Sequence, residues 1–357
     1  MKRIFVSAIF ALCAIMSASA QDAQAAAADA AKAISEAPEA APVVEKPKYW
    51  TNSLMTNLSV GQTSLSNWAA GGDNTVSFAG FVDGNANYAR NEMFWNNRLQ
   101  LDYGFLYASS KPILQKSNDR IYLESKWGYK AYQDVLYFSA NYDFKSQFTT
   151  GYDYNTPASL VDENGNDLEG DFLKQAWKDA RALKSGFLAP AYTNLALGID
   201  YKPAKWLSVN FAPLTGGFVI VRNEALRGSY SMPLKKEYEG KAEADIPTDG
   251  SQFASSRFEF GAQLKMDAKV NVNDNFSYTT QVVLFTNYLD IHHCPRINWD
   301  NRIDWKLAKY FSLTMTTNLI YDDTIMIADK NGENPKARVQ FKESLAFGFT
   351  YTIATKK

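Results

Sequence analysis

Residues 257–270 read RFEFGAQLKMDAKV, and this stretch decides the fold of the chain. Apolar side chains occupy every second position: Phe258, Phe260, Ala262, Leu264, Met266, Ala268 and Val270. Polar residues and one glycine occupy the positions between them. A helix would mix the two sets on every face, whereas a β-strand places successive side chains on opposite faces. The stretch is therefore predicted to be a strand with one apolar and one polar face.

The same period of two recurs in residues 136–148, 297–307 and 339–353. Soluble β-sandwiches alternate in this way too, so the length of the strands has to separate the two classes. The predicted strands are about 11–16 residues long, whereas strands of soluble sheets usually have about 5–6. A tilted strand needs about 9–11 residues to cross a bilayer. The length favours an all-β fold, a transmembrane antiparallel β-barrel.

The alternation predicts about 12 strands in this barrel, and 10–14 are compatible with the pattern. The first strand alternates poorly. The seventh contains Pro213 and Gly216-Gly217, which favour a bulge or a kink. The predicted strands are 49–62, 74–89, 94–109, 120–131, 135–150, 189–202, 207–222, 255–271, 276–290, 296–307, 311–326 and 339–353.

Short and long connections alternate between the predicted strands. Short turns are expected near 90–93, 132–134, 203–206, 273–275 and 308–310. Longer loops are expected at about 63–73, 110–119, 151–188, 223–254, 291–295 and 327–338. Outer-membrane barrels have short periplasmic turns and longer extracellular loops. Because an even number of strands brings both ends to one side, we expect both termini in the periplasm.

The N-terminal region has a different organisation. Lys2 and Arg3 precede an apolar run that is followed by small residues at 17–20. This layout is typical of a secretory signal peptide, which we predict for residues 1–20. Residues 21–47 are rich in Ala, Pro and Glu and predict a flexible periplasmic tail. The barrel is then expected to occupy residues 48–357.

Residues that carry chemistry are scarce in the predicted mature chain. His292 and His293 are neighbours in one short loop beside Cys294, which suits neither a catalytic triad nor one shared metal ion. The segment 162–167 is interpreted as a turn rather than a calcium site. We therefore expect no enzymatic activity, no metal and no cofactor. The net charge of −1 argues against nucleic acid as a partner.

The polar faces of the strands are expected to line the lumen, because the apolar faces would meet lipid. Two alternatives follow for their charged side chains. They line a narrow passage for small solutes, or they pair across strands and fill the lumen. Opposite charges at close quarters tend to pair, so we favour the filled lumen. The candidates are Glu124, Lys126, Lys130, Glu259, Lys265, Asp267, Asp300, Arg302, Asp304 and Lys306.

One segment, GQTSLSNWAAGGDNTVS at residues 61–77, carries a motif. It resembles the Asn-Trp-Ala-x-Gly-Gly signature of a family of Bacteroidota outer-membrane proteins of unknown function. The matching residues are Asn67, Trp68, Gly71 and Gly72. The resemblance extends over about 49–351 and implies a barrel in the outer membrane, but no activity. We interpret the motif as a structural corner, because two glycines allow a tight reversal of the chain.

These observations predict an outer-membrane barrel of uncharacterised role, surrounded by membrane lipid. In the leading hypothesis it is not an enzyme, and its lumen is a narrow small-solute channel or is filled. In the alternative it is a non-conducting accessory subunit that binds another envelope protein. A surface hydrolase is the least favoured hypothesis.

Overall fold

In the computed structural model, twelve antiparallel strands form one closed barrel. The structure describes residues 49–63, 74–290, 292, 294–327, 334 and 336–354. No helix among these residues has the length and apolar character needed to cross a membrane. The barrel strands are β1 (Trp50–Thr63), β2 (Thr75–Arg90), β3 (Met93–Ala108), β4 (Lys111–Tyr132), β5 (Leu136–Ser146), β8 (Ala191–Ala204), β9 (Leu207–Ile220), β10 (Ser256–Asn271), β11 (Phe276–Asn287), β12 (Arg296–Lys306), β13 (Phe311–Tyr321) and β16 (Gln340–Ala354).

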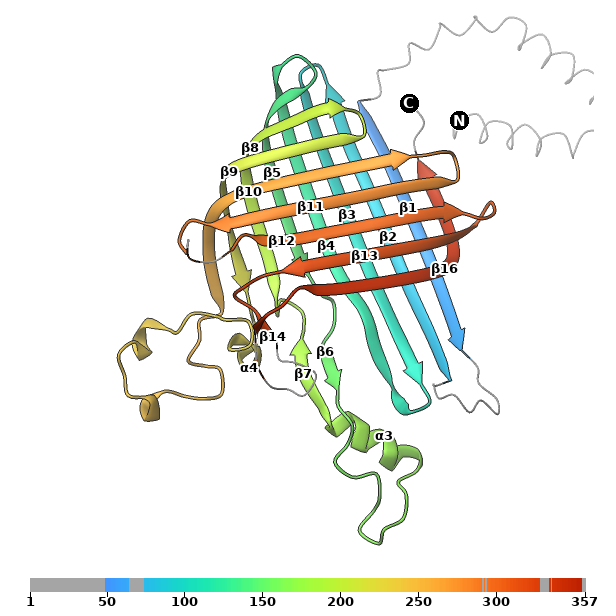
Figure 1. Ribbon diagram of the computed structural model, residues 1–357, viewed down its shortest axis with the longest axis vertical. Helices are drawn as coiled ribbons and strands as arrows, with labels where there is room; N and C mark the ends of the chain where they lie inside the picture. Colours follow the sequence, from blue (N-terminus) through green and yellow to red (C-terminus); the bar gives the residue numbers. More distant parts are fainter. Residues whose placement is uncertain are drawn as a thin grey trace, which may run out of the picture. The chain divides into compact units, whose positions relative to one another are not determined.

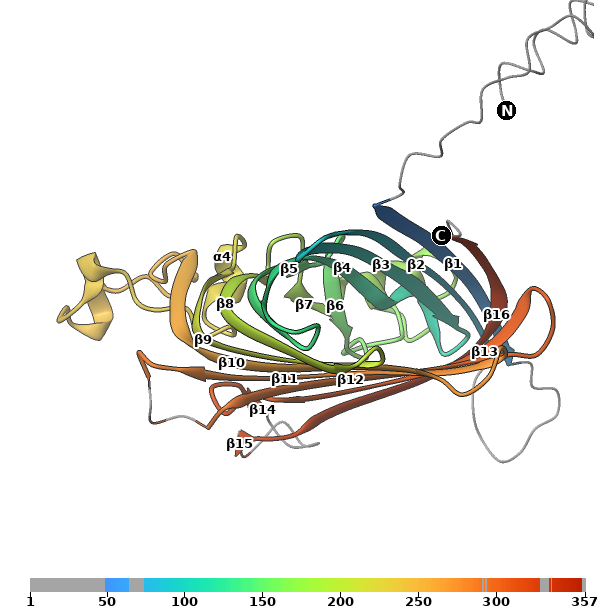
Figure 2. The same ribbon diagram turned by 90° about the horizontal axis from the view of Figure 1, so that it is seen from above.

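The barrel closes where the first and last strands pair. Strand β1 pairs with β16 in a register that sets Leu54 opposite Ile353 and Leu58 opposite Phe349. Strands β10 to β13 cross β1 to β5 steeply in Figure 1, and Figure 2 shows the two groups on opposite sides of the lumen. Opposite walls of a barrel cross in this way because the strands tilt against its axis. Closure gives each of the twelve barrel strands a neighbour on both sides.

The predicted strand number of about 12 is confirmed, and short and long connections alternate except between β3 and β4. One predicted loop, 110–119, is wrong. Strand β3 ends at Ala108, and β4 already begins at Lys111. The pairing of these strands shifts register beside Gly104 and beside Ala108. The polar run that suggested a loop therefore belongs to a long, bulged strand whose polar residues face the lumen.

Strand β9 contains the irregularity expected from Pro213. The register between β8 and β9 shifts between Leu197 and Ile199, and the register between β10 and β9 shifts between Gly261 and Gln263. Proline has no N–H to donate to a neighbouring strand, so the regular ladder is interrupted at such a residue. The bulge lets β9 remain a barrel strand in spite of its proline.

The outer face of the barrel is apolar. Leu58, Phe341 and Leu345 are 65%, 62% and 66% exposed. A row of aromatic residues crosses four strands at the short-turn end, where direct pairing sets Trp50 opposite Tyr88, Tyr88 opposite Trp95, and Trp95 opposite Trp127. Such aromatic girdles mark the level where a membrane barrel meets the lipid headgroups.

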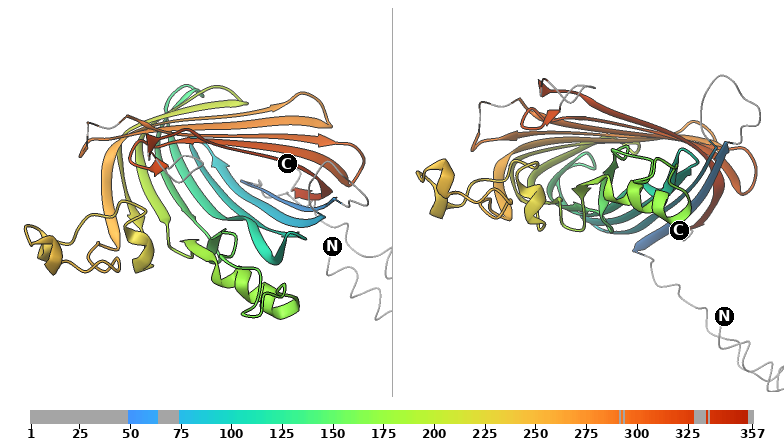
Figure 3. Two further views of the ribbon diagram at one scale, coloured as in Figure 1. Left: turned by 60° about the horizontal axis from the view of Figure 1, so that its bottom comes forward. Right: turned by 90° about the horizontal axis from the view of Figure 1, so that it is seen from below.

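The longest connections lie at the end of the barrel opposite the short turns (Figure 3). Between β5 and β8 the chain forms β6 (Gly151–Tyr154), α3 (Gly170–Asp179) and β7 (Arg181–Ser185). This long loop therefore contains a helix of 10 residues. Its Trp177 is buried, with Lys111 Nζ 5.7 Å from the ring centroid. This contact fixes the helix to the start of β4.

Two further connections carry short elements. The β9–β10 connection holds α4 (Glu224–Arg227), η2 (Lys236–Tyr238) and η3 (Glu243–Asp245), and the β13–β16 connection holds β14 (Met326–Ile327) and β15 (Lys336–Ala337). A small apolar cluster joins α4 to the ends of β8 and β9. Its buried members are Ala189, Val219, Val221, Leu226 and Met232. The long loops thus have a core of their own beside the barrel.

We expect Gly198→Ala to destabilise the barrel by about 1–3 kcal/mol through overpacking. A Cβ atom at Gly198 would lie 2.1 Å from the carbonyl oxygen of Phe211 and 2.5 Å from Cα of Ala212. Both atoms belong to the bulged backbone of β9, which cannot move as a side chain can. Urea unfolding of the barrel refolded in lipid vesicles measures the difference.

The matched control is Gly84→Ala in β2, where a Cβ atom would meet only the Leu54 side chain, at 3.7 Å, and the Leu99 carbonyl oxygen, at 3.9 Å. We expect this variant to unfold at nearly the same urea concentration as the unchanged protein. Equal unfolding midpoints for both variants would contradict the tight approach of β8 and β9.

Candidate functional site

The lumen contains a cavity of about 1970 Å³. A water molecule occupies about 30 Å³ in the liquid, so this space corresponds to tens of waters. The lining comes mainly from β1 to β4 and from β12, β13 and β16, together with the short turns. The lumen is therefore hollow along these walls. The sequence favours a filled lumen, and this prediction holds only along the remaining walls, at β8 to β10.

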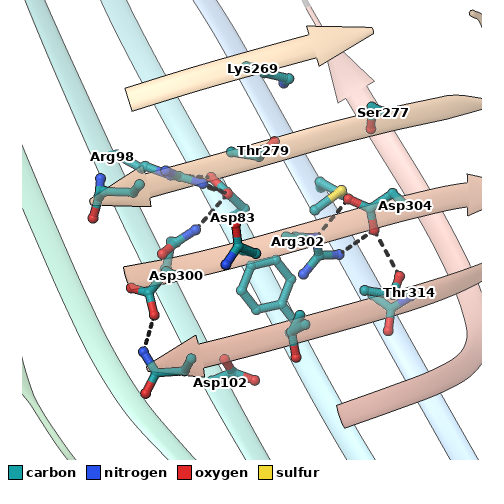
Figure 4. Close-up of a pocket in the computed structure, with 18 of the residues that line it drawn as sticks. Asp83, Arg98, Asp102, Lys269, Ser277, Thr279, Asp300, Arg302, Asp304 and Thr314 are labelled. Carbon is teal, nitrogen blue, oxygen red and sulfur yellow. Dashed lines mark hydrogen bonds and ion pairs between the residues drawn. The ribbon is translucent and has the colours of Figure 1, made fainter. Parts of the chain in front are cut away.

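The period of two explains which side chains reach the cavity. On β2 and β3 the inward set carries a buried network around Asp83 (Figure 4). The Arg98 guanidinium donates to Asp83 at 2.6 Å, Gln100 Nε2 donates at 2.9 Å, and Asn85 Nδ2 donates at 2.7 Å. Asp83 thus accepts from three donors on two neighbouring strands, which neutralises its charge and fixes this wall.

A second network lies on β12 and β13. Arg302 donates to both carboxylate oxygens of Asp304, at 2.7 and 2.8 Å, and Thr314 donates to Asp304 at 2.8 Å (Figure 4). The guanidinium carbon of Arg302 also lies 4.5 Å from the centroid of the Phe81 ring. Phe81 belongs to β2, which is separated from β12 by β13, β16 and β1. This cation–π contact therefore crosses the lumen.

The filled part of the lumen is held by buried ion pairs. Lys265 on β10 donates to Glu124 on β4, and these side chains are 3% and 13% exposed. Lys126 Nζ lies 2.6 Å from Asp200 Oδ1, and Lys202 Nζ lies 3.3 Å from Asp200 Oδ2. Strands β9, β8 and β5 separate β10 from β4, so the first pair also crosses the lumen. Long side chains of opposite sign meet here and leave no continuous space.

The structure places seven of the ten predicted lumen residues on the cavity wall: Glu124, Lys126, Asp267, Asp300, Arg302, Asp304 and Lys306. Lys265 is instead buried against Glu124. Lys130 pairs with Asp134 at 2.6 Å beside a short turn. Glu259 pairs with Arg257 and Arg296 in a separate small pocket near the long loops. The motif residues Asn67, Trp68, Gly71 and Gly72 lie outside the described residues.

Several charged lumen residues are absent from the predicted set: Asp83, Arg98, Asp102, Arg120, Lys269 and Lys342. The charged lumen residues on β2 and β3 follow the same alternation of two and could have been predicted from it. The outward positions of β2 are weakly apolar, because Gly80, Gly84 and Ala86 occupy them. The alternation is consequently less visible there than on β10.

The loop Asp162–Asp167 behaves as the predicted turn in its contacts. The backbone N–H groups of Asn164 and Asn166 both donate to Asp162 Oδ1 at 2.8 Å, and Gly165 has φ +82°. The hydrogen bonds from Asn166 lower the pKa of Asp162 below its ordinary value. Within the described ranges, no group of three His, Cys, Asp or Glu side chains is arranged to hold a metal ion.

Comparison with protein families gives one match. Residues 60–152 match the model of a family described as a protein of unknown function, DUF3078. This range includes β2 to β5 and the segment 61–77. The match supports the expected relation to a family of unknown function, whereas the Bacteroidota origin and the motif stay predictions. No curated protein matches the chain in sequence.

Solved structures with similarity to this chain include three bacterial proteins. An outer membrane channel from Pseudomonas putida F1 has 10% identity and a TM-score of 0.35, and the match covers 89% of this chain and 100% of that one. The translocator domain of the autotransporter NalP from Neisseria meningitidis has 10% identity and a TM-score of 0.36, with 92% and 97% covered. The toluene transporter TodX of P. putida has 11% identity and a TM-score of 0.30, with 87% and 91% covered.

We expect Lys265→Met to destabilise the barrel by about 3–5 kcal/mol, because it leaves the buried Glu124 charge without its partner. The double variant Lys265→Met with Glu124→Gln removes both charges and is expected to recover much of that loss. Urea unfolding in lipid vesicles measures both free energies.

The control is Lys184→Met, which breaks the ion pair with Asp153 in the loop hairpin, where the two side chains are 63% and 54% exposed. Exposed pairs contribute about 0–1 kcal/mol, so this variant should unfold almost normally. A Lys265→Met protein as stable as this control would show that the cross-lumen pair does not hold the walls together.

Proposed function

We propose that this chain is an outer-membrane barrel that forms a narrow, water-filled passage for small polar solutes. The observation that carries this proposal is the cavity of about 1970 Å³, whose wall carries many charged and amide side chains beside apolar ones. A barrel that served only as a rigid support would have no need of a polar space of this size.

The exterior supports insertion into a membrane. Every barrel strand has at least 11 residues, and about 9–11 residues cross a bilayer when tilted. Leucine and aromatic side chains are exposed along the outer faces, and an aromatic row marks one end of β1 to β4. We place the termini and short turns in the periplasm and the long loops outside the cell, as is usual for outer-membrane barrels.

The extent of the cavity supports a passage rather than a closed pocket. At the short-turn end its lining includes Asn273, Asp274 and Lys306. Toward the long loops it includes Gly61 and Gln147. Gly61 lies two residues from the end of β1, and Gln147 directly follows β5. The hollow space thus follows most of the length of the strands.

The decisive experiment is conductance of the purified, refolded protein in planar bilayers. We expect discrete conductance steps in KCl, because an aqueous passage carries ions. A correctly folded barrel that inserts but shows no conductance would overturn the channel. Stoichiometric co-purification of such a silent barrel with another envelope protein would favour the accessory subunit.

We expect Ala79→Trp to lower the single-channel conductance several-fold. Ala79 faces the cavity from β2, so an indole ring there fills part of the passage. The control is Ala86→Trp, seven residues further along the same strand on its opposite face, where an indole meets lipid. Equal conductance of the two variants would exclude the cavity as the conducting path.

A further inference from the structure

Among the cations on the cavity wall that form no ion pair with a described carboxylate, three lie away from the short turns. They are Arg120 on β4, Lys145 on β5 and Lys342 on β16. Arg120 Nη2 donates to Gln100, but its buried Nε has no acceptor among the described residues. Among the described residues, Lys342 Nζ donates only to the amide oxygen of Asn118, at 2.7 Å. These side chains keep hydrogen-bond donors and positive charge directed at the lumen.

The three cations lie at one level of the lumen. Lys145 pairs across the sheet with Tyr122, which is two residues from Arg120 on the same face of β4. Lys342 reaches across the lumen to Asn118, two residues from Arg120 on the other side. Both lysines are within electrostatic range of Arg120. Arg120 is therefore the centre of one positive cluster.

The carboxylates at this level do not neutralise the cluster. Asp102 accepts a hydrogen bond from Asn118 at 2.7 Å, and Asp300 accepts one from Asn318. Neither carboxylate is within ion-pair distance of a described cation. Asp83 and Asp304, in contrast, are paired with Arg98 and Arg302. A third carboxylate, Asp143, lies within electrostatic range of Lys145, but it accepts from Asn194 at 3.0 Å and is not part of the cavity wall. On the cavity wall at this level, three unpaired cations therefore face two unpaired carboxylates.

We propose that Arg120, Lys145 and Lys342 form an anion-preferring constriction, so that the passage favours small anions over cations of similar size. This inference rests on the proposed channel function. Rings of Arg or Lys side chains favour anions in pores, because a passing anion gains Coulomb energy that a cation loses. The free donors of Arg120 and Lys145 also suit the oxygens of a compact carboxylate or phosphate.

Two contacts that cross the lumen lie near this cluster. Lys342 to Asn118 joins β16 to β4, and Arg302 to Phe81 joins β12 to β2. Both contacts occupy part of the lumen at the level of Arg120, because Phe81 pairs with Asp102 and Asp102 pairs with Arg120 across the sheet. A fixed charge acts over about 10 Å at 0.1 M salt, and the cluster is effective only within that distance.

The test is the reversal potential across a bilayer in a KCl gradient centred near about 0.1 M, where screening is weak. We expect the unchanged barrel to prefer chloride. The double variant Arg120→Gln with Lys145→Gln should lower the chloride-to-potassium permeability ratio, by about twofold for each charge removed. The control is Lys184→Gln in the exposed loop hairpin, which removes one positive charge far from the cavity wall and should leave the ratio unchanged.

Two variants of carboxylate residues keep the test valid even if the variants that remove Arg120 and Lys145 fold poorly. Asp102→Asn and Asp300→Asn should each raise the chloride preference, because they remove negative charge from the same level. The constriction is overturned if the barrel conducts without a preference for chloride. It is also overturned if none of these variants changes the permeability ratio. Either result leaves the proposed channel function intact. A folded barrel without conductance overturns the channel itself, and with it this inference.

Discussion

The structure depends on one constraint: each backbone N–H and C=O group needs a partner, and lipid offers none. Pairing of β1 with β16 meets this requirement for the last two edges of the sheet. Closure then leaves each strand with one face outward and one face inward. The alternation of apolar and polar residues follows from that geometry. The charged lumen is therefore a consequence of backbone pairing as much as of function.

The sizes of the inward side chains divide the lumen. Where β8 and β10 face one part of β4, long charged side chains meet and exclude continuous space, as Lys265 and Glu124 do. On β13 and β16 the inward residues are short, for example Thr314, Thr316 and Ser344, and the cavity lies against them. The sequence is compatible with a filled lumen and with a passage, and this barrel combines both. Charge alone could not separate them, because the outcome depends on which residues face each other across the lumen.

The strands could be predicted closely, because period two is a local signal that each strand carries by itself. The loop expected at 110–119 was wrong because a bulged strand with Ser117 and Asn118 has the composition of a loop. Most predicted lumen residues reach the cavity for the same local reason. The pairing of Lys265 with Glu124 and the contact of Arg302 with Phe81 could not be predicted. Both contacts join strands that are distant in the sequence. A single sequence does not show which distant residues meet across the lumen.

The pair of Lys265 and Glu124 has a consequence for the order of assembly. Its members are 141 positions apart, on walls that face each other only in the closed barrel. Bringing such distant residues together costs chain entropy, which must be overcome before the contact stabilises anything. The pair therefore forms late, after the sheet has curled. Contacts of this kind slow unfolding more than they speed folding, so the pair prolongs the lifetime of the assembled barrel.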